Sequence, residues 1–252
     1  MKKVLLIKPY NRSDHIQPSL GLGWLANNIR DIVEVRIYDC IKERAGKAEL
    51  LNEIRYFAPD YVGFQCYTFD IFNIKEILPE IKKINTKIIT IIGGPHPTLA
   101  GTECFEFFGD SLDYIFSGES EIGFRDFLKG EQVSNISGLG YRVGSKIMIN
   151  PLCFHNELDD FGIPAWDLIR PETYPESQHG AFFENFPIAP IIITRGCPFD
   201  CTFCSGNKIS GKKVRFRSVK SVITEMKMLY SNFGIREFHI IDDNFIINKK
   251  YA

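Results

Sequence analysis

The sequence lacks the features that direct a protein to a membrane, to secretion or to nucleic acid. It contains no apolar run of about 18 residues, the length that a membrane-spanning helix needs. The apolar stretch after Met1-Lys2-Lys3 is too short for a signal peptide. The formal net charge is -1, so there is no basic excess of the kind that nucleic-acid-binding proteins carry. We therefore expect a globular protein of the cytoplasm.

The cysteines are odd in number. The chain has seven cysteines and no secretion signal, which argues against a disulfide framework and for a reducing compartment. Three of them, Cys197, Cys201 and Cys204, stand close together at C-x3-C-x2-C spacing. No second C-x2-C pair accompanies them, although zinc ribbons usually combine two pairs. Three thiolates so close in sequence can converge on one inorganic centre.

Three interpretations of these cysteines compete. A structural zinc site would need a fourth ligand from far away, for which His239 is the candidate. Free thiols or a disulfide are the second interpretation. An iron–sulfur cluster is the third and the best supported, because it takes thiolate ligands and three of them would leave one iron open for chemistry.

The first half of the chain alternates between strand and helix patterns. Five such β-α units in about 130 residues predict a doubly wound, flavodoxin- or Rossmann-like parallel sheet with helices on both faces. Ligands of this architecture bind beyond the carboxyl ends of the strands. Gly93-Gly94 follows one strand, where it either lets a ligand approach the backbone or only makes a tight turn. The expected strands are 4–7, 33–38, 61–64, 88–92 and 114–116, and the expected helices are 20–29 with Ser19 as N-cap, 50–57, 74–84, 104–108 and 118–128.

The middle of the chain reads as a connector. Apolar segments 139–143 and 146–149 flank Gly144-Ser145 and predict a β-hairpin. Frequent prolines between Pro151 and Pro190 then disfavour regular structure. Cys153 and His155 have metal-ligand spacing but no partner pair nearby. We therefore expect three regions: an α/β domain at 1–135, a hairpin and linker at 136–189, and a second domain from 190 to 252.

The last region places the cysteines at the end of a strand. The apolar run 191–194 predicts a buried strand that leads into the cysteine loop. Ser218 is the expected N-cap of a helix whose core stripe is Val222, Ile223, Met226, Leu229 and Tyr230. A further strand at 238–241 ends at Asp242-Asp243, whose carboxylates either meet a ligand or, for Asp243, cap the next turn.

Three stretches of the first half resemble the cobalamin-binding domain that precedes many radical S-adenosylmethionine (SAM) enzymes. They are PSLGLGWLA at 18–26, GGPHPT at 93–98 and SGESE at 117–121. The resemblance covers roughly residues 1–130 and implies a corrinoid across the strand ends, with its nucleotide tail slotted into the sheet. The D-x-H-x-x-G motif of some cobalamin proteins is absent, since Asp14 and His15 are adjacent, so His15 is not assigned as a cobalt ligand. The cobalamin-binding residues that the resemblance implies are Pro9, Leu20, Thr68, Gly93, Gly94, His96, Gly118 and Glu119.

The segment RGCPFDCTFC at 195–204 closely resembles the radical SAM signature, and PAWDL at 164–168 resembles the linker of the cobalamin-dependent members. The resemblance implies a [4Fe-4S] cluster on Cys197, Cys201 and Cys204 whose open iron binds SAM. One-electron reduction then cleaves SAM to a 5′-deoxyadenosyl radical, while the protein binds, orients and excludes water. It also implies that Phe203, Asp242 and Asp243 contact SAM.

The family resemblance leaves the activity of this chain open. The radical SAM core is a partial barrel of several β-α units, and only two strands and one helix are expected after Pro190. We therefore expect a member truncated within that core, with a complementary C-terminal fragment as a possible partner. The first hypothesis is an enzyme, such as a cobalamin-dependent methyltransferase or cyclase, with a small-molecule substrate and a reductant such as flavodoxin or ferredoxin. The second is a corrinoid-binding module or inactive fragment that does no chemistry alone.

Overall fold

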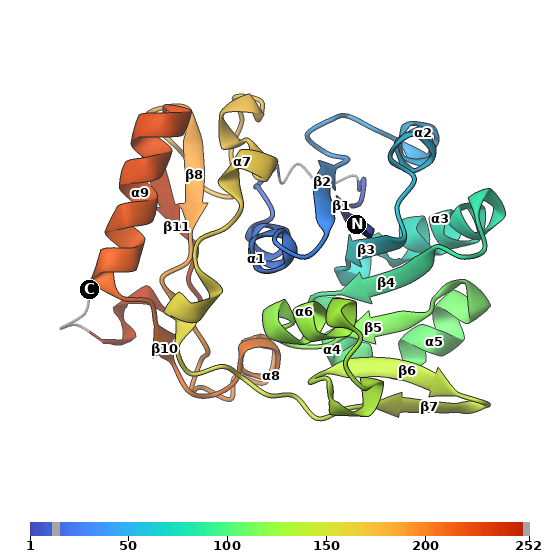
Figure 1. Ribbon diagram of the computed structural model, residues 1–252. Coiled ribbons are helices and arrows are strands. Elements are labelled where there is room, and N and C mark those ends of the chain that lie inside the picture. The colour runs from blue at the N-terminus through green and yellow to red at the C-terminus, as the bar shows by residue number, and fades with distance from the viewer. Residues whose placement is uncertain (12–15, 249–252) are drawn as a thin grey trace.

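Residues 1–11 and 16–248 are described by the computed structural model in Figure 1. Its larger sheet has seven strands in the order β2-β1-β3-β4-β5-β6-β7. The first five are parallel, and their 2-1-3-4-5 order is that of flavodoxin-like folds, which bind ligands at the switch point between β1 and β3. Their bounds are β1 Lys3–Lys8, β2 Glu34–Asp39, β3 Tyr61–Gln65, β4 Ile89–Gly93 and β5 Tyr114–Phe116. The doubly wound parallel sheet predicted from the sequence is confirmed.

Two helix layers bury this sheet, which is why β1 is apolar on both faces. Leu5 and Ile7 pack under α2 (Lys47–Phe57), α3 (Ile71–Ile84) and α5 (Glu103–Phe108). Val4 and Leu6 pack under α1 (Leu20–Ile29) and α6 (Glu121–Lys129) on the opposite face. Ser19 caps α1 by accepting a hydrogen bond from the Leu22 amide at 3.3 Å, as its position before the apolar stripe predicts.

The sequence patterns missed or shifted some elements. The short helix α4 (Pro95–Ala100) was not expected. Pro95 occupies its first turn, where no backbone donor is needed. The hairpin strands β6 (Leu139–Val143) and β7 (Lys146–Ile149) were expected in the connector, but they extend the first sheet: β6 pairs antiparallel with β5, and β7 pairs antiparallel with β6. Pairing of the sheet therefore continues to Ile149, and β6 covers the edge that β5 would otherwise expose.

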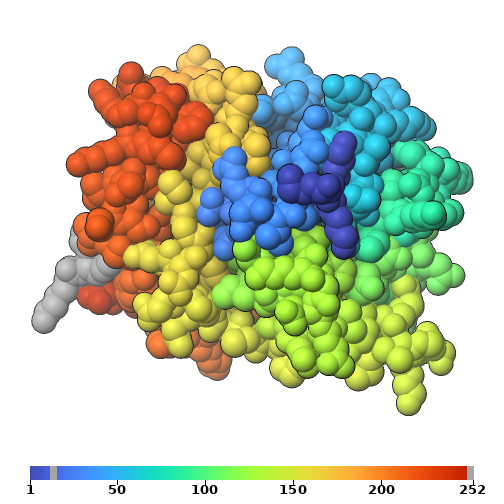
Figure 2. Space-filling view, viewed as in Figure 1, coloured from blue at the N-terminus to red at the C-terminus, as the bar shows by residue number. Residues whose placement is uncertain are grey.

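The connector packs between the two halves of the molecule. It contains the short helix α7 (Trp166–Ile169) and joins Leu20 and Trp24 of α1 to Ile191 in one apolar cluster. Figure 2 shows the yellow connector filling the surface between the blue first helix and the orange C-terminal part. Short 3-10 helices lie at Thr68–Asp70, Gly109–Ser111, Val133–Asn135, Leu158–Phe161, Pro171–Thr173 and Phe245–Ile247.

The C-terminal part contains two small sheets. Strand β8 (Ile188–Ile191) pairs parallel with β11 (Glu237–Ile240), and β9 (Thr194–Arg195) pairs antiparallel with β10 (Arg215–Phe216). The predicted strand at 191–194 is wrong in its bounds, because the buried residues that pair with β11 begin at Ile188. The helices are α8 (Gly206–Ser210) and α9 (Val219–Phe233).

The apolar stripe of α9 is only partly core. Ser218 caps the helix, and Val222 and Leu229 are buried as expected. Ile223 and Tyr230 are 42% and 56% exposed, so their assignment to the core is wrong. The stripe is wider than the face that packs against the connector and β8. Among the described helices, none is long and apolar enough to span a bilayer.

Candidate functional site

A cavity of about 450 Å³ lies at the carboxyl edge of the parallel strands. Leu6 of β1, Gly63 of β3 and Ile91 of β4 line its sheet side, at the switch point where this fold binds ligands. Gly206 of α8 and Asp243, which follows β11, line its opposite side. One cavity thus joins the strand ends of the first sheet to the neighbourhood of the cysteine loop.

Two adjacent glycines form part of the cavity wall for different reasons. Gly94 has φ of +104° and ψ of -163°, a backbone conformation that only glycine adopts readily. A Cβ at Gly94 would lie 3.3 Å from the carbonyl oxygen of Cys66. Gly93 has no positive φ, and a Cβ there would meet Phe116 at an ordinary 3.8 Å. The turn therefore requires glycine at 94. At 93 the fold would accept a Cβ, and the missing side chain leaves space in the cavity that Gly93 lines.

The residues predicted to bind cobalamin fall into two groups. Gly93, Gly94, Gly118 and Glu119 line the cavity. The other four are not among its described lining residues: Leu20 packs in the connector core, and Pro9 is buried at the end of β1. His15 lies outside the described residues.

The remaining two of that second group, Thr68 and His96, bond to each other. Thr68 Oγ1 lies 3.1 Å from His96 Nδ1, at the rim of the same strand ends. Burial lowers the pKa of His96 below its ordinary value, so the imidazole is neutral at neutral pH. The imidazole has two polar atoms: Nδ1 bonds Thr68, and Nε2 is the second.

The three signature cysteines lie on a loop between β9 and α8. The Cys197 amide donates to the Gly211 carbonyl at 3.0 Å, and the Gly206 amide donates to Cys204 Sγ at 3.4 Å. Cys201 and Cys204 are exposed, Cys197 is half-buried, and all three thiols are free. A backbone donor to sulfur is typical of thiolates that hold iron–sulfur clusters.

Across residues 1–11 and 16–248, no three or more His, Cys, Asp or Glu side chains are gathered so as to hold a single metal ion. The fourth zinc ligand considered from the sequence, His239, instead bonds Glu237 through Nε2 at 2.9 Å. His155 likewise bonds Asp160 at 2.7 Å. A cluster of several irons distributes its thiolates over different iron atoms, so the spread loop fits a cluster better than one zinc ion.

The other buried cysteines differ chemically from the loop. Burial raises the pKa of Cys40 to about 12 and that of Cys104 to about 11, and it raises the pKa of Cys66 further. Such thiols stay protonated and are poor ligands and nucleophiles. Cys40, Cys66 and Cys104 are therefore poor candidates for holding a metal centre.

The strand end predicted to meet SAM contains two different carboxylates. Asp242 accepts hydrogen bonds from the Ile193 amide at 2.7 Å and from the amide and hydroxyl of Thr194 at 2.9 Å each. It therefore ties the end of β11 to the strand that leads into the cysteine loop. Asp243 lines the cavity beside Gly206 and is the carboxylate without such a set of backbone donors. Phe203 is 92% exposed and points away from the apolar cores.

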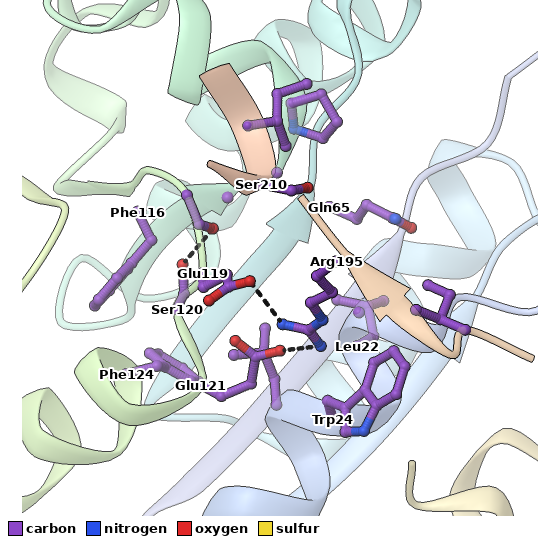
Figure 3. Close-up of a pocket in the computed structure, with 18 of the residues that line it drawn as sticks. Leu22, Trp24, Gln65, Phe116, Glu119, Ser120, Glu121, Phe124, Arg195 and Ser210 are labelled. Carbon is purple, nitrogen blue, oxygen red and sulfur yellow. Dashed lines mark hydrogen bonds and ion pairs between the residues drawn. The ribbon is translucent and has the colours of Figure 1, made fainter. Parts of the chain in front are cut away.

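The sequence patterns did not reveal the charged wall of the cavity. Figure 3 shows the guanidinium of Arg195, from β9, facing both Glu119 and Glu121, and the same group lies over the ring of Trp24. Arg195 Nη2 lies 2.7 Å from Glu121 Oε1, and Arg195 Nη1 lies 3.5 Å from Glu119 Oε1. Burial alone would lower the pKa of Arg195, but Glu121 and Glu119 raise it above its ordinary value. Because the partners are far apart in sequence, only the fold could show this contact.

Known proteins match both halves of the chain. The B12 binding domain family matches residues 11–128, and the radical SAM superfamily matches residues 191–252. An uncharacterized methyltransferase of Pyrococcus horikoshii is 31% identical over 99% of this chain and 55% of its own length. The cytidylyl-2-hydroxyethylphosphonate methyltransferase of Streptomyces wedmorensis is 27% identical over 100% of this chain and 56% of its own length. The chain thus spans about half the length of these curated relatives.

Solved structures share the fold. The radical SAM methyltransferase TsrM of Kitasatospora setae, with cobalamin and a [4Fe-4S] cluster bound, has a TM-score of 0.77 at 19% identity, over 100% of this chain and 51% of its own. The cobalamin-dependent SAM radical enzyme OxsB, with aqua-cobalamin bound, has a TM-score of 0.81 at 20% identity, over 98% of this chain and 34% of its own. With a B12-binding domain in front of a radical SAM segment, the chain belongs to the cobalamin-binding radical SAM proteins.

Proposed function

We propose that this chain binds cobalamin in the cavity at the strand ends and a [4Fe-4S] cluster on Cys197, Cys201 and Cys204. The observation that carries the proposal is that one cavity is lined both by the B12-binding sheet and by Gly206, which follows the last cysteine. Two cofactors that share a cavity can exchange a group or an electron without crossing bulk water.

The chain supplies the shape and polarity of both sites. Gly63, Gly93 and Gly94 give the corrinoid a flat backbone wall, and Ser120 adds a hydroxyl at its edge. The three loop thiols hold the cluster, and the Gly206 amide donates to one of them. Asp243 would accept hydrogen bonds from the SAM amino group or ribose, with Phe203 nearby in the loop. When bound, the reduced cluster supplies the electron that cleaves SAM.

We propose radical methyl transfer or ring modification of a small molecule as the reaction of the whole protein. Curated relatives of this chain include methyltransferases and the anaerobic magnesium-protoporphyrin IX monomethyl ester cyclase of Rubrivivax gelatinosus. A one-electron donor such as flavodoxin or ferredoxin and a complementary C-terminal fragment complete the proposed partners. Seven free cysteines fit the reducing cytoplasm.

We divide the chain into the cobalamin-binding domain at 1–135, the hairpin and linker at 136–189 and the radical SAM segment from 190. The hairpin pairs with β5, so it belongs physically to the edge of the first sheet. The apolar cluster that joins α1, the connector and β8 supports a fixed arrangement of the two ends.

A corrinoid-binding module without its own chemistry is the second candidate. It is favoured by the completeness of the first sheet: five parallel strands supply the corrinoid side, whereas the described C-terminal part has one parallel pair, β8 with β11. In that case the chain would carry cobalamin to a partner.

Anaerobic reconstitution of the full chain tests both candidates. We expect broad thiolate-to-iron absorbance, binding of hydroxocobalamin, and production of 5′-deoxyadenosine from SAM under strong reductant. Cys201→Ala should remove the iron absorbance and leave hydroxocobalamin binding intact. Cobalamin binding without 5′-deoxyadenosine would support the module, and iron absorbance that survives Cys201→Ala would refute the ligand assignment.

A further inference from the structure

The neck of the cysteine loop carries two arginines at facing positions. Arg195 of β9 lies directly opposite Arg215 of β10 in the antiparallel pair that closes the loop. One residue precedes the cysteines and the other follows them, so the two side chains mark both ends of the segment 196–214. Any contact that fixes both arginines therefore fixes the base of the loop.

A single carboxylate of the first domain contacts both arginines. Glu119 accepts a bidentate pair of hydrogen bonds from Arg215 at 2.6 and 2.7 Å, and it lies 3.5 Å from Arg195. Glu121 completes the set by accepting from Arg195 at 2.7 Å. The four side chains are Arg195, Arg215, Glu119 and Glu121, and we call them the neck cluster.

The neck cluster is buried and flanked by aromatic rings. Its side chains are 13%, 2%, 7% and 6% exposed, in the order Arg195, Arg215, Glu119 and Glu121. The Arg195 guanidinium lies 4.7 Å from the Trp24 ring and 4.9 Å from the Phe161 ring. Ion pairs withdrawn from water are screened little, and removal of one partner leaves an uncompensated charge. Removal of one member of the neck cluster should therefore cost more than removal of one member of a surface pair.

The loop beyond the neck has few anchors of its own. Cys201 and Cys204 are exposed, and Asn207 holds the turn by donating to the Phe199 carbonyl and the Asp200 carboxylate. Beyond the neck, α8 packs against α4 of the first domain, while the buried ion pairs to that domain lie at the base of the loop. Glu119 and Glu121 lie in the same wall of the cavity as Gly118, on the proposed corrinoid side.

We propose that Arg195 and Arg215 are positioning residues which, through Glu119 and Glu121, fix the cysteine loop over the corrinoid side of the cavity and couple the two cofactor sites. This inference rests on the proposed function for its cofactors, but the clamp itself is a property of the chain. It assigns Glu119 to the neck of the loop rather than to direct contact with the corrinoid.

Hydrogen exchange of the cofactor-free full chain tests the clamp. In Glu119→Gln and Glu121→Gln, we expect peptides that cover 195–217 to exchange about tenfold faster or more, while those of β3 stay unchanged and show that the sheet is folded. Asp31→Asn is the matched control, because it breaks another bidentate arginine pair to α6, with Arg125 at 2.7 Å, at an exposed site. Equal exchange of 195–217 in Glu121→Gln and Asp31→Asn would overturn the proposal.

The coupling between the two sites has a second readout, the effect of cluster loading on hydroxocobalamin affinity, which a merely structural role would not change. In the wild type, cluster loading should tighten hydroxocobalamin binding about tenfold, within the usual range of coupling between sites. In Glu121→Gln, the ratio of hydroxocobalamin affinities with and without the cluster should fall to one. The separate variant Arg195→Lys, which keeps the charge, should retain part of the wild-type ratio. A ratio in Glu121→Gln equal to that of the wild type would overturn the coupling. A wild type that binds neither cofactor would refute the proposed function, while the exchange measurement still decides on the clamp.

Discussion

The two adjacent glycines of the cavity wall should respond oppositely to the same added methyl group. Gly94 has a positive φ in a region that costs a side-chain-bearing residue about 1–3 kcal/mol. Its added Cβ would also lie 3.3 Å from a backbone oxygen, that of Cys66, which cannot move without shifting β3. An alanine restricts the unfolded chain and offsets at most about 1 kcal/mol of this. We therefore expect Gly94→Ala to lower the free energy of unfolding by about 1–2 kcal/mol.

Gly93→Ala is the matched control at the next residue. Its Cβ would meet Phe116 at 3.8 Å, which is ordinary contact, so the free energy of unfolding should stay equal or rise by up to about 1 kcal/mol. Urea denaturation of the cofactor-free chain, with a common slope, measures both variants. If Gly94→Ala is as stable as Gly93→Ala, the reasoning from backbone conformation is refuted.

The same two variants distinguish a glycine that the turn needs from a glycine that leaves space for the ligand. Since nothing in the fold requires glycine at 93, its added methyl should mainly reduce the space left for a corrinoid. We expect Gly93→Ala to weaken hydroxocobalamin binding at least about tenfold, a loss of about 1.4 kcal/mol, without loss of stability. Wild-type affinity in Gly93→Ala would show that the missing side chain at 93 does not serve the corrinoid.

Three further outcomes follow from the site. Iodoacetamide at neutral pH should label the exposed loop thiols of the apo chain and spare Cys40, Cys66 and Cys104, because their raised pKa values keep them protonated. Early labelling of these three thiols would contradict their burial. Asp242→Ala removes the acceptor of two backbone amides and should lower the free energy of unfolding by about 2 kcal/mol or more. An unchanged urea midpoint would show that Asp242 does not hold the end of β11 to the strand that leads into the cysteine loop. Burial lowers the pKa of His96, so at this position the unfolded chain binds more protons than the folded chain. The neutral imidazole therefore contributes stability that is present above about pH 6.5 and is lost as the pH falls through the folded pKa. An NMR titration midpoint of His96 above about 6.5 would contradict this.

The first half of the fold was readable from the sequence because its signals are local. An apolar run such as 4–7 indicates a strand buried on both faces, and Ser19 before an apolar stripe indicates a helix start. The sequence pattern predicts that strand β8 begins at residue 191, three residues after its actual start at Ile188, because Pro190 is of a residue type that disfavours regular structure. Proline is tolerated in β8 because that strand pairs with β11 alone among the described strands.

The candidate site divides in the same way. The sequence by itself determined the three loop thiols and the glycines at 93 and 94, because residue type and spacing carry that chemistry. Only the tertiary structure decided that Asp242 serves the backbone and that Glu119 contacts two arginines. Those contacts join residues 48 to 96 positions apart, and no periodic pattern encodes such a distance. Their geometry comes from strand order and burial, which bring the end of the first sheet against the neck of the cysteine loop.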